Sequence, residues 1–213
     1  MAHEHPFYLA GQWLRSSTPL PVINPFDDSQ IGMTWLADET AVETATRAAV
    51  DSAPIMRDLP AFARAGILAR ASAGIQARRD EIGLALAGEA GKPIRDALTE
   101  VDRAAMTFHV ASEEARRLTG DVVPMDLAPH GKGRLAIVRR YPIGPIAGIS
   151  PFNFPLNLSA HKIAPALAAG NTIVLKPATK TPLSALFLAK VLDEAGLPKG
   201  ALSVTVVVRS PGN

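Results

Sequence analysis

Residues Tyr141 to Pro182 read YPIGPIAGISPFNFPLNLSAHKIAPALAAGNTIVLKPATKTP, and this stretch decides the fold. The run Ile146–Ser150 predicts one strand, and the short run Thr172–Leu175 predicts a second, buried strand. A helical pattern fills residues 155–170 between them, and Ser203–Val208 predicts a third strand after another helix. Strands that alternate with helices at this spacing predict right-handed crossovers and a parallel sheet. We therefore expect an α/β protein that contains the first β-α-β-α-β half of a doubly wound fold.

The two crossover helices carry their own signals. Pro165 lies inside the first helix, and an interior proline costs about 3 kcal/mol or forces a kink, so we expect a bend just after Lys162. Thr181 is expected to cap the second helix, with Pro182 at its first position and Gly196 at its end.

Polar segments follow the first two strands, at the edge where open α/β sheets bind their ligands. An asparagine amide at this edge can donate a hydrogen bond to a developing oxyanion, and a lysine can hold ribose hydroxyls or a phosphate. A structural alternative is that Asn153 only caps the helix beginning at Pro155 and that Lys176 is solvated. The residues alone leave both interpretations open. The two segments are Ser150, Pro151, Phe152 and Asn153 after the first strand, and Lys176, Pro177, Ala178 and Thr179 after the second.

The preceding residues predict a hairpin, a strand, a series of helices and an arm. Asp38 is expected to cap a helix that Pro54 ends at about Ala53. Two later strands would form the hairpin arm. The other expected elements are the hairpin Phe7–Leu14, the strand Ile31–Ala37, helices from Pro60, over Asp80–Ala90 with Gly91 as its stop, and from Pro93 to Gly120, and the arm strands Asp121–Met125 and Arg134–Tyr141.

This pattern divides the chain into three expected parts. Residues 1–120 form an N-terminal hairpin and the helical part, and residues 121–141 form a bridging arm suited to oligomerisation. Residues 142–213 form the incomplete β-α-β-α-β unit. Val206, Val207 and Val208 would then be left as an apolar edge strand unless a partner covers them.

The composition narrows the classes of function. Apolar residues make up 47% and charged residues 20%, which is typical of globular proteins. The formal charge is only +2 and the basic residues are scattered, so we expect no nucleic-acid partner. No apolar run reaches the about 20 residues that span a bilayer, and the N-terminus has no signal-peptide pattern. We therefore expect no membrane partner and a cytoplasmic location. Without cysteine there is no disulfide and no cysteine nucleophile.

The block PFNFPLNLSAHKIAPALAAGNTIVLKPATKTPLSA strongly resembles the NAD(P)-dependent aldehyde dehydrogenase superfamily. The resemblance covers essentially the whole chain. It includes the opening hairpin and the segments INPFD, EAGKP, TGDVVP and GLPKGALSV. It implies that residues 142–213 belong to a Rossmann-like cofactor domain, with NAD or NADP as cofactor and an aldehyde as substrate. It also implies a homo-oligomer for the full-length protein.

The resemblance implies roles for single residues. Asn153 matches the asparagine whose amide stabilises the oxyanion, and Lys176 matches the lysine that contacts the adenosine ribose. Lys162 matches a lysine sometimes assigned to proton relay, the alternative being a surface lysine on a kinked helix. Ile149, Ser150 and Pro151 match positions that line the cofactor cleft, and Phe152, Pro177 and Thr179 are assigned to the same cofactor-binding edge.

One departure from the family pattern concerns the cofactor. Many NAD-preferring members carry a glutamate where this chain has Thr179, in the run KPATKTP. A glutamate would repel a 2′-phosphate, whereas threonine does not, and Lys176 and Lys180 add positive charge. We therefore expect that NADP is tolerated or preferred.

A second departure concerns catalysis. The family mechanism needs a cysteine thiolate and a glutamate that activates water, and both would follow residue 213. The chain therefore resembles an N-terminal portion of an aldehyde dehydrogenase that lacks dehydrogenase activity alone. The alternatives are a non-catalytic nucleotide-binding protein and a pseudoenzyme that associates with intact homologues. A related acyl-phosphate or semialdehyde reductase also remains open.

Overall fold

The computed structural model describes residues 3–207 and contains the expected parallel sheet. Strand β8 (Pro145–Ile149) pairs in parallel with β9 (Thr172–Lys176), and β9 pairs in parallel with β10 (Leu202–Val204). Helices α5 (Pro155–Ala168) and α6 (Leu183–Glu194) form the two crossovers between them. The predicted β-α-β-α-β unit is confirmed.

The prediction that the end of the chain is left as an apolar edge strand is wrong for Val206, because the N-terminal hairpin extends the sheet beyond β10. Strand β2 (Phe7–Leu9) pairs antiparallel with β10, so the strand order is β3-β2-β10-β9-β8, with β3 at Gln12–Leu14. Val206 is fully buried, and its carbonyl accepts a hydrogen bond of 2.8 Å from the amide of Ala37. Val208 lies outside the described residues. The parallel edge without a strand partner in the described part of the chain is β8.

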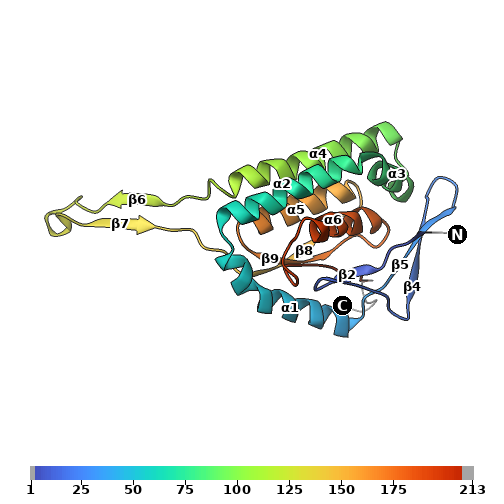
Figure 1. Cartoon of the computed structure of the whole chain (residues 1–213), viewed down its shortest axis with the longest axis horizontal. Helices are drawn as coiled ribbons and strands as arrows, with labels where there is room; N and C mark the ends of the chain where they lie inside the picture. Colours follow the sequence, from blue (N-terminus) through green and yellow to red (C-terminus); the bar gives the residue numbers. More distant parts are fainter. Residues whose placement is uncertain (1–2, 208–213) are drawn as a thin grey trace.

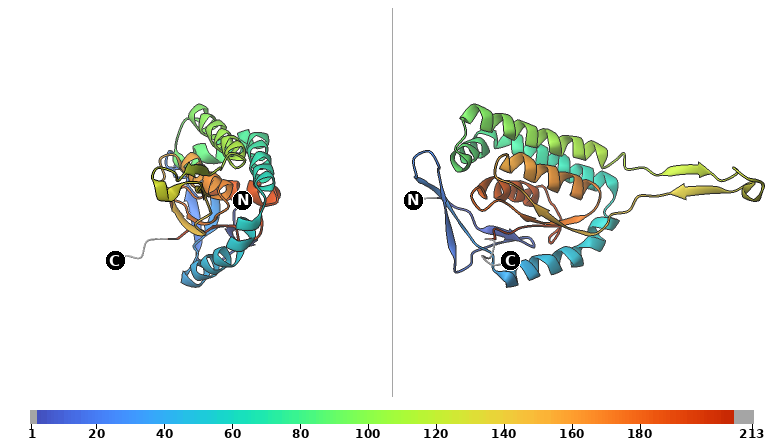
Figure 2. Two further views of the ribbon diagram at one scale, coloured as in Figure 1. Left: turned by 90° about the vertical axis from the view of Figure 1, so that its left-hand side faces the viewer. Right: turned by 180° about the vertical axis from the view of Figure 1, so that it is seen from behind.

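Helices cover both faces of this sheet (Figures 1 and 2). Helices α5 and α6 pack on one face, and α1 (Glu39–Asp58) packs on the other. Three further helices form an outer layer over α5 and α6, namely α2 (Ala61–Ala77), α3 (Arg79–Ala90) and α4 (Ile94–Glu114). The main core lies between these layers and includes Leu68, Ile82, Phe108, Ile163, Leu175 and Leu188.

Two smaller sheets lie outside the main sheet. Near the N-terminus, β5 (Gln30–Trp35) lies between β1 (His3–Glu4) and β4 (Pro19–Ile23). At the opposite end of the molecule, β6 (Asp121–Pro124) and β7 (Leu135–Val138) form a long projecting arm (Figure 1), with a short 3-10 turn at Pro129–Gly131. The predicted arm is confirmed as a hairpin.

Several helix ends differ from their expected positions. Helix α1 continues past Pro54 to Asp58, because its buried residues Ala49, Ser52 and Met56 lie on the opposite side from the exposed proline. Burial of that stripe outweighs the hydrogen bond that Pro54 cannot donate. Helix α4 ends at Glu114 rather than at Gly120.

The left-handed stop at Gly91 (φ 62°) is confirmed as the C-terminal cap of α3. Helix α5 is continuous from Pro155 to Ala168 despite Pro165, and no break follows Lys162. Helix α6 ends at Glu194, two residues before Gly196.

The start of α6 is stabilised by a residue that the sequence did not indicate. Thr181 was expected to cap it, but its hydroxyl is buried without a hydrogen-bond partner. Instead, the carboxylate of Glu89 accepts hydrogen bonds from the amides of Leu183 (2.7 Å) and Ser184 (3.0 Å). A carboxylate at a helix N-terminus both satisfies free N–H groups and interacts favourably with the helix dipole.

Candidate active-site edge

The two polar segments meet where β8 and β9 end. Ile149 is the register partner of Lys176, and the amide of Ser150 donates to the Lys176 carbonyl at 3.1 Å. The segments that begin at these residues therefore leave the sheet side by side, as predicted from the topology. The structure places residues 150–153 and 176–179 at one edge of the molecule.

Asn153 is exposed on the turn between β8 and α5. Its alternative role as a helix cap is not seen, because Phe154 occupies the N-cap position and no side-chain cap bond forms there. The amides of Leu156 and Asn157 donate instead to one carboxylate oxygen of Glu100, at 3.1 and 3.0 Å. The amides at the start of α5 are thus satisfied by α4, and Asn153 is left exposed.

A cationic group accompanies this buried carboxylate. Lys92 Nζ lies 2.5 Å from the second oxygen of Glu100, in an ion pair that is almost fully buried. The same Nζ lies 5.0 Å from the centroid of the Phe154 ring, and the guanidinium carbon of Arg103 lies 6.0 Å from it. Both distances fall within the range of cation–π attraction. The ring of Phe154, the residue next to Asn153, therefore lies near two cations, one from the α3–α4 connection and one from α4.

On the β9 side, the side chains predicted to bind a cofactor are only partly free. Pro177 is buried, whereas Lys176 and Thr179 are half-buried. The hydroxyl of Thr179 donates to the Val207 carbonyl at 3.3 Å. The Ser150 hydroxyl is buried and accepts a hydrogen bond of 3.0 Å from Ser159. Lys176 therefore remains the ammonium group nearest the end of this strand.

The recorded hydrogen bond of Lys162 lies within its own helix. Its Nζ donates to the carbonyl of Leu158, one turn earlier in the same helix, at 3.3 Å. No recorded contact among the described residues links it to Asn153 or Lys176. Its position fits either of the interpretations drawn from the sequence.

The rim itself is unusually apolar for an exposed surface. Ile149 and Phe152 are 68% and 63% exposed, and Pro151 beside them is exposed too. Large apolar side chains next to polar groups at the end of a parallel strand are typical of ligand sites. This edge therefore combines exposed apolar side chains with the half-buried Lys176.

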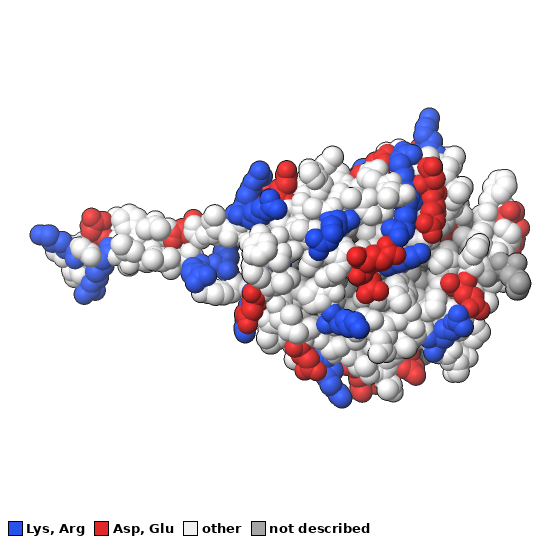
Figure 3. Space-filling view, viewed as in Figure 1, with Lys and Arg blue, Asp and Glu red and all other residues white. Residues whose placement is uncertain are grey.

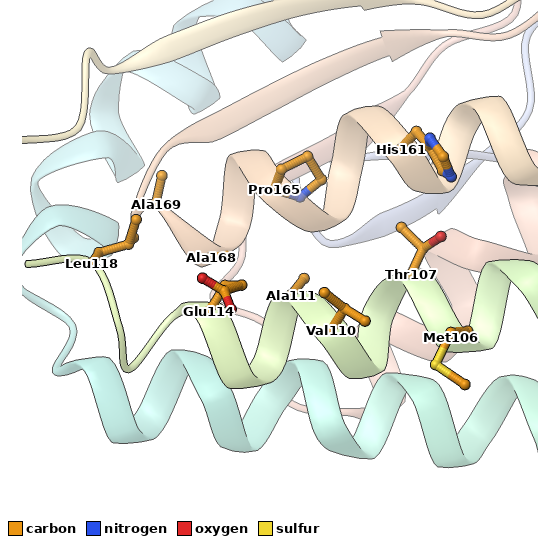
Figure 4. Close-up of a pocket in the computed structure, with 10 residues that line it drawn as sticks. All are labelled: Met106, Thr107, Val110, Ala111, Glu114, Leu118, His161, Pro165, Ala168 and Ala169. Carbon is orange, nitrogen blue, oxygen red and sulfur yellow. The ribbon is translucent and has the colours of Figure 1, made fainter.

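A groove of about 450 Å³ lies between α4 and α5. Figure 4 shows Thr107, Val110 and Ala111 on α4 facing His161 and Pro165 on α5. The groove is predominantly apolar, and Glu114 lies at its far end. Its size suits a small organic molecule. It was not located from the sequence, because its two walls are separated by the whole arm.

Glu89 is the strongest electrostatic feature that the sequence did not reveal. Burial raises the pKa of Glu89 to about 7, although its hydrogen bonds with Ser184 and Leu183 act in the opposite direction. The available signal was its place in the last turn of α3, where a carboxylate opposes its own helix dipole. Such a residue needs an explanation from elsewhere in the fold, and here it is the start of α6.

The described residues contain neither a candidate metal site nor a helix able to cross a membrane. From residue 3 to residue 207, no group of three or more His, Cys, Asp or Glu side chains is placed to hold a metal ion. Over the same range, no helix combines the length and the hydropathy needed to cross a bilayer. Figure 3 shows basic and acidic side chains interspersed over the body, with basic groups at both ends of the arm.

Comparisons with known proteins agree with this architecture. The model of the aldehyde dehydrogenase family matches residues 13–211. The 3-sulfolactaldehyde dehydrogenase of Priestia megaterium is 39% identical over 201 residues, which are 94% of this chain and 42% of that protein. The chain therefore spans about two fifths of the length of this curated relative.

Solved structures show the same relation. Aldehyde dehydrogenase 21 of Physcomitrella patens, in complex with the reaction product succinate, is 40% identical with a TM-score of 0.95, covering 98% of this chain and 44% of that one. The NADP-dependent glyceraldehyde-3-phosphate dehydrogenase of Bacillus halodurans, complexed with NADP, is 32% identical with a TM-score of 0.93, covering 99% and 44%.

Proposed function

Because the chain belongs to the aldehyde dehydrogenase family, whose members use NAD(P), we propose that it forms the N-terminal part of an enzyme that oxidises an aldehyde to a carboxylic acid. The observation that carries this proposal is the exposed Asn153. It lies on the turn between the end of β8 and α5, and Glu100 of α4 accepts a hydrogen bond from an amide in the first turn of α5. An amide in this place can donate a hydrogen bond to an oxyanion that forms on the aldehyde carbon.

The nucleophile must come from outside this chain, which has no cysteine. A thiolate that attacks the aldehyde would place negative charge on the carbonyl oxygen, and Asn153 would stabilise that charge. NAD(P), when bound, supplies the hydride acceptor. Lys176 would hold the ribose, and the exposed Ile149, Pro151 and Phe152 would cover the cofactor's apolar surface. The 213 residues alone would then have no dehydrogenase activity.

We propose a short aldehyde that carries an anionic group as the substrate class. The relatives' names include 3-sulfolactaldehyde and glyceraldehyde-3-phosphate, and one structure holds succinate. In this chain, exposed Arg103 lies beside Phe154, one turn before Met106 and Thr107 of the α4–α5 groove. An aldehyde in this groove would therefore have a guanidinium near Asn153.

We further propose a homo-oligomer that uses the β6–β7 arm. The arm shows apolar side chains on both of its strands and forms no part of the main core. Such an exposed two-stranded ribbon favours burial against a second copy of the protein. The exposed arm side chains are Val122, Val123, Met125, Leu127, Leu135, Ile137 and Val138.

A non-catalytic protein that binds nucleotide or associates with intact homologues is the second candidate, favoured by the absence of cysteine from the chain. Reading the coding DNA beyond codon 213 separates the two. Continuation into a cysteine and a glutamate supports the dehydrogenase, and a true stop codon supports the second candidate.

The role of Asn153 is tested in the longer protein, if the frame continues. Asn153→Ala should lower kcat about 10²- to 10³-fold because one oxyanion donor is lost. Glu43→Gln, a change of an exposed residue in α1 on the other face of the sheet, is the control. Unchanged kcat in Asn153→Ala would exclude this role.

A further inference from the structure

The segment Glu89–Pro93, which runs from the last turn of α3 to the residue before α4, contacts the N-terminal ends of both crossover helices. Glu89 accepts hydrogen bonds from the first amides of α6. Three residues later, Lys92 pairs with Glu100, which accepts from the amides of α5. The left-handed Gly91 lies between the two, so the direction of Lys92 is set by the end of α3. This short segment therefore supports the starts of the two helices that follow the polar segments of the candidate site.

We propose that Lys92 and Glu100 are positioning residues for the Asn153 amide. The proposal deepens the proposed function, since it rests on Asn153 as the oxyanion donor. Glu100 holds the first turn of α5 through Leu156 and Asn157, and Lys92 lies over the ring of Phe154. Asn153 directly precedes Phe154, and Leu156 and Asn157 follow in the first turn of α5. Its backbone therefore has little freedom once these residues are held.

The contacts of the turn itself support this role. Phe152, Asn153 and Phe154 are exposed, and no side-chain hydrogen bond of Asn153 is recorded within the described part of the chain. Phe154 has no side-chain cap bond either. The contacts that hold the C-terminal side of this turn therefore come from Glu100, Lys92 and Arg103. An oxyanion donor is effective only when it is already oriented.

The competing explanation is that the ion pair only stabilises the fold. The two explanations separate because a buried ion pair can often be replaced by neutral groups of similar volume with little loss of stability. The double variant Lys92→Met/Glu100→Gln removes both charges together and leaves no unpaired buried charge. Its glutamine oxygen can still accept from Leu156 and Asn157. Of the two cations beside the Phe154 ring, the Lys92 ammonium is lost and the Arg103 guanidinium remains.

The experiment measures the backbone of Asn153 directly in the 213-residue chain. The ¹⁵N relaxation of its backbone N–H is recorded in the original chain, in Lys92→Arg and in the double variant, with Asn153→Asp used to assign the signal. Thermal unfolding is followed on the same samples. Lys132→Met, a change of an exposed lysine in the arm, is the matched control.

We expect the backbone N–H of Asn153 to be as rigid as the amides of α5 in the original chain, in Lys92→Arg and in the control. In the double variant we expect it to become mobile while the unfolding temperature falls by only a few degrees. Equal rigidity in the double variant, or mobility already in the original chain, would overturn the proposal. Neither measurement involves cofactor or catalysis, so this result is independent of whether the longer protein is a dehydrogenase.

Discussion

Glu89 and Glu100 are both buried, and each hydrogen-bonds two backbone amides at the start of a crossover helix. They differ in their second partner. Glu100 has the ammonium group of Lys92, whereas no basic side chain pairs with Glu89 among the described residues. This difference predicts that removing Glu100 leaves a buried cation unpaired, and that Glu89 responds to pH.

Glu100→Ala should destabilise the fold by about 3–5 kcal/mol, because it leaves the buried Lys92 ammonium without its partner and two helix amides without an acceptor. Urea unfolding at pH 7 measures the loss. Glu113→Ala, on the exposed part of the same helix, should stay within about 0.5 kcal/mol. A loss below that control limit would show that the Lys92–Glu100 pair contributes nothing to stability.

Glu89 should make the folded state less stable as pH rises from about 4.5 to about 7. Its pKa is higher in the folded chain than in the unfolded chain, so within this window the folded state holds a proton that the unfolded state has released. Its stabilising contribution is complete below the ordinary pKa and is lost as pH passes 7. Glu89→Gln should remove this dependence. Urea unfolding at several pH values tests it, and parallel curves for the two proteins would contradict it.

Among the secondary-structure elements, α5 and α6 are held at both ends by charged side chains of the outer helical layer. At the C-terminal ends, Arg64 donates to the Ala168 carbonyl at 3.0 Å, and Arg70 donates to the Ala195 carbonyl at 2.8 Å. Carboxylates at the N-termini and guanidinium groups at the C-termini both interact favourably with the helix dipoles. The outer layer therefore sets where the crossover helices begin, and with them the two polar segments.

The arm is the element with the most exposed apolar surface, and its prediction concerns self-association. Val122 and Ile137 are cross-strand partners and are 71% and 69% exposed. Val122→Glu/Ile137→Glu should weaken self-association at least tenfold, because charges would have to be buried in the contact. Sedimentation velocity measures it. Thermal unfolding of the diluted chain should be unchanged, since the arm lies outside the main core. An unchanged oligomeric state would exclude the arm as the contact.

In the molecule as a whole, as far as the structure describes it, β8 is an edge strand of the main sheet and pairs with β9 on one side only. Relatives more than twice as long share nearly all of this chain with the same fold. The edge formed by β8 and β9 is where we expect the choice between NAD and NADP to be made.

NADP should bind more tightly than NAD at equal ionic strength, because Thr179 has no charge to repel a 2′-phosphate and Lys176 and Lys180 lie nearby. Thr179→Glu should lower NADP affinity about tenfold or more and change NAD affinity much less. Calorimetric titration of the chain measures both, with Thr107→Glu on the opposite helical layer as the control. Comparable or tighter binding of NAD by the original chain would contradict the expectation.

The local pattern of the chain was sufficient for most elements. Apolar runs of strand length, helical stripes and the glycine at position 91 predicted β8, β9, α3 and the arm, because backbone conformation and burial periodicity are set by neighbouring residues. The same pattern brought Asn153 and Lys176 to one edge, since parallel strands joined by helices end on the same side.

Contacts between distant parts of the chain could not be obtained in this way. The pairing of β2 with β10, the burial of Val206 and the caps from Glu89 and Glu100 depend on which segments meet after folding. Pro54 was misjudged for the same reason, because the helix around it is held by packing against the sheet rather than by its own propensity. Local residues determine which elements form. Burial and hydrogen-bond satisfaction across the whole molecule determine where their ends lie and which side chains support the candidate active-site edge.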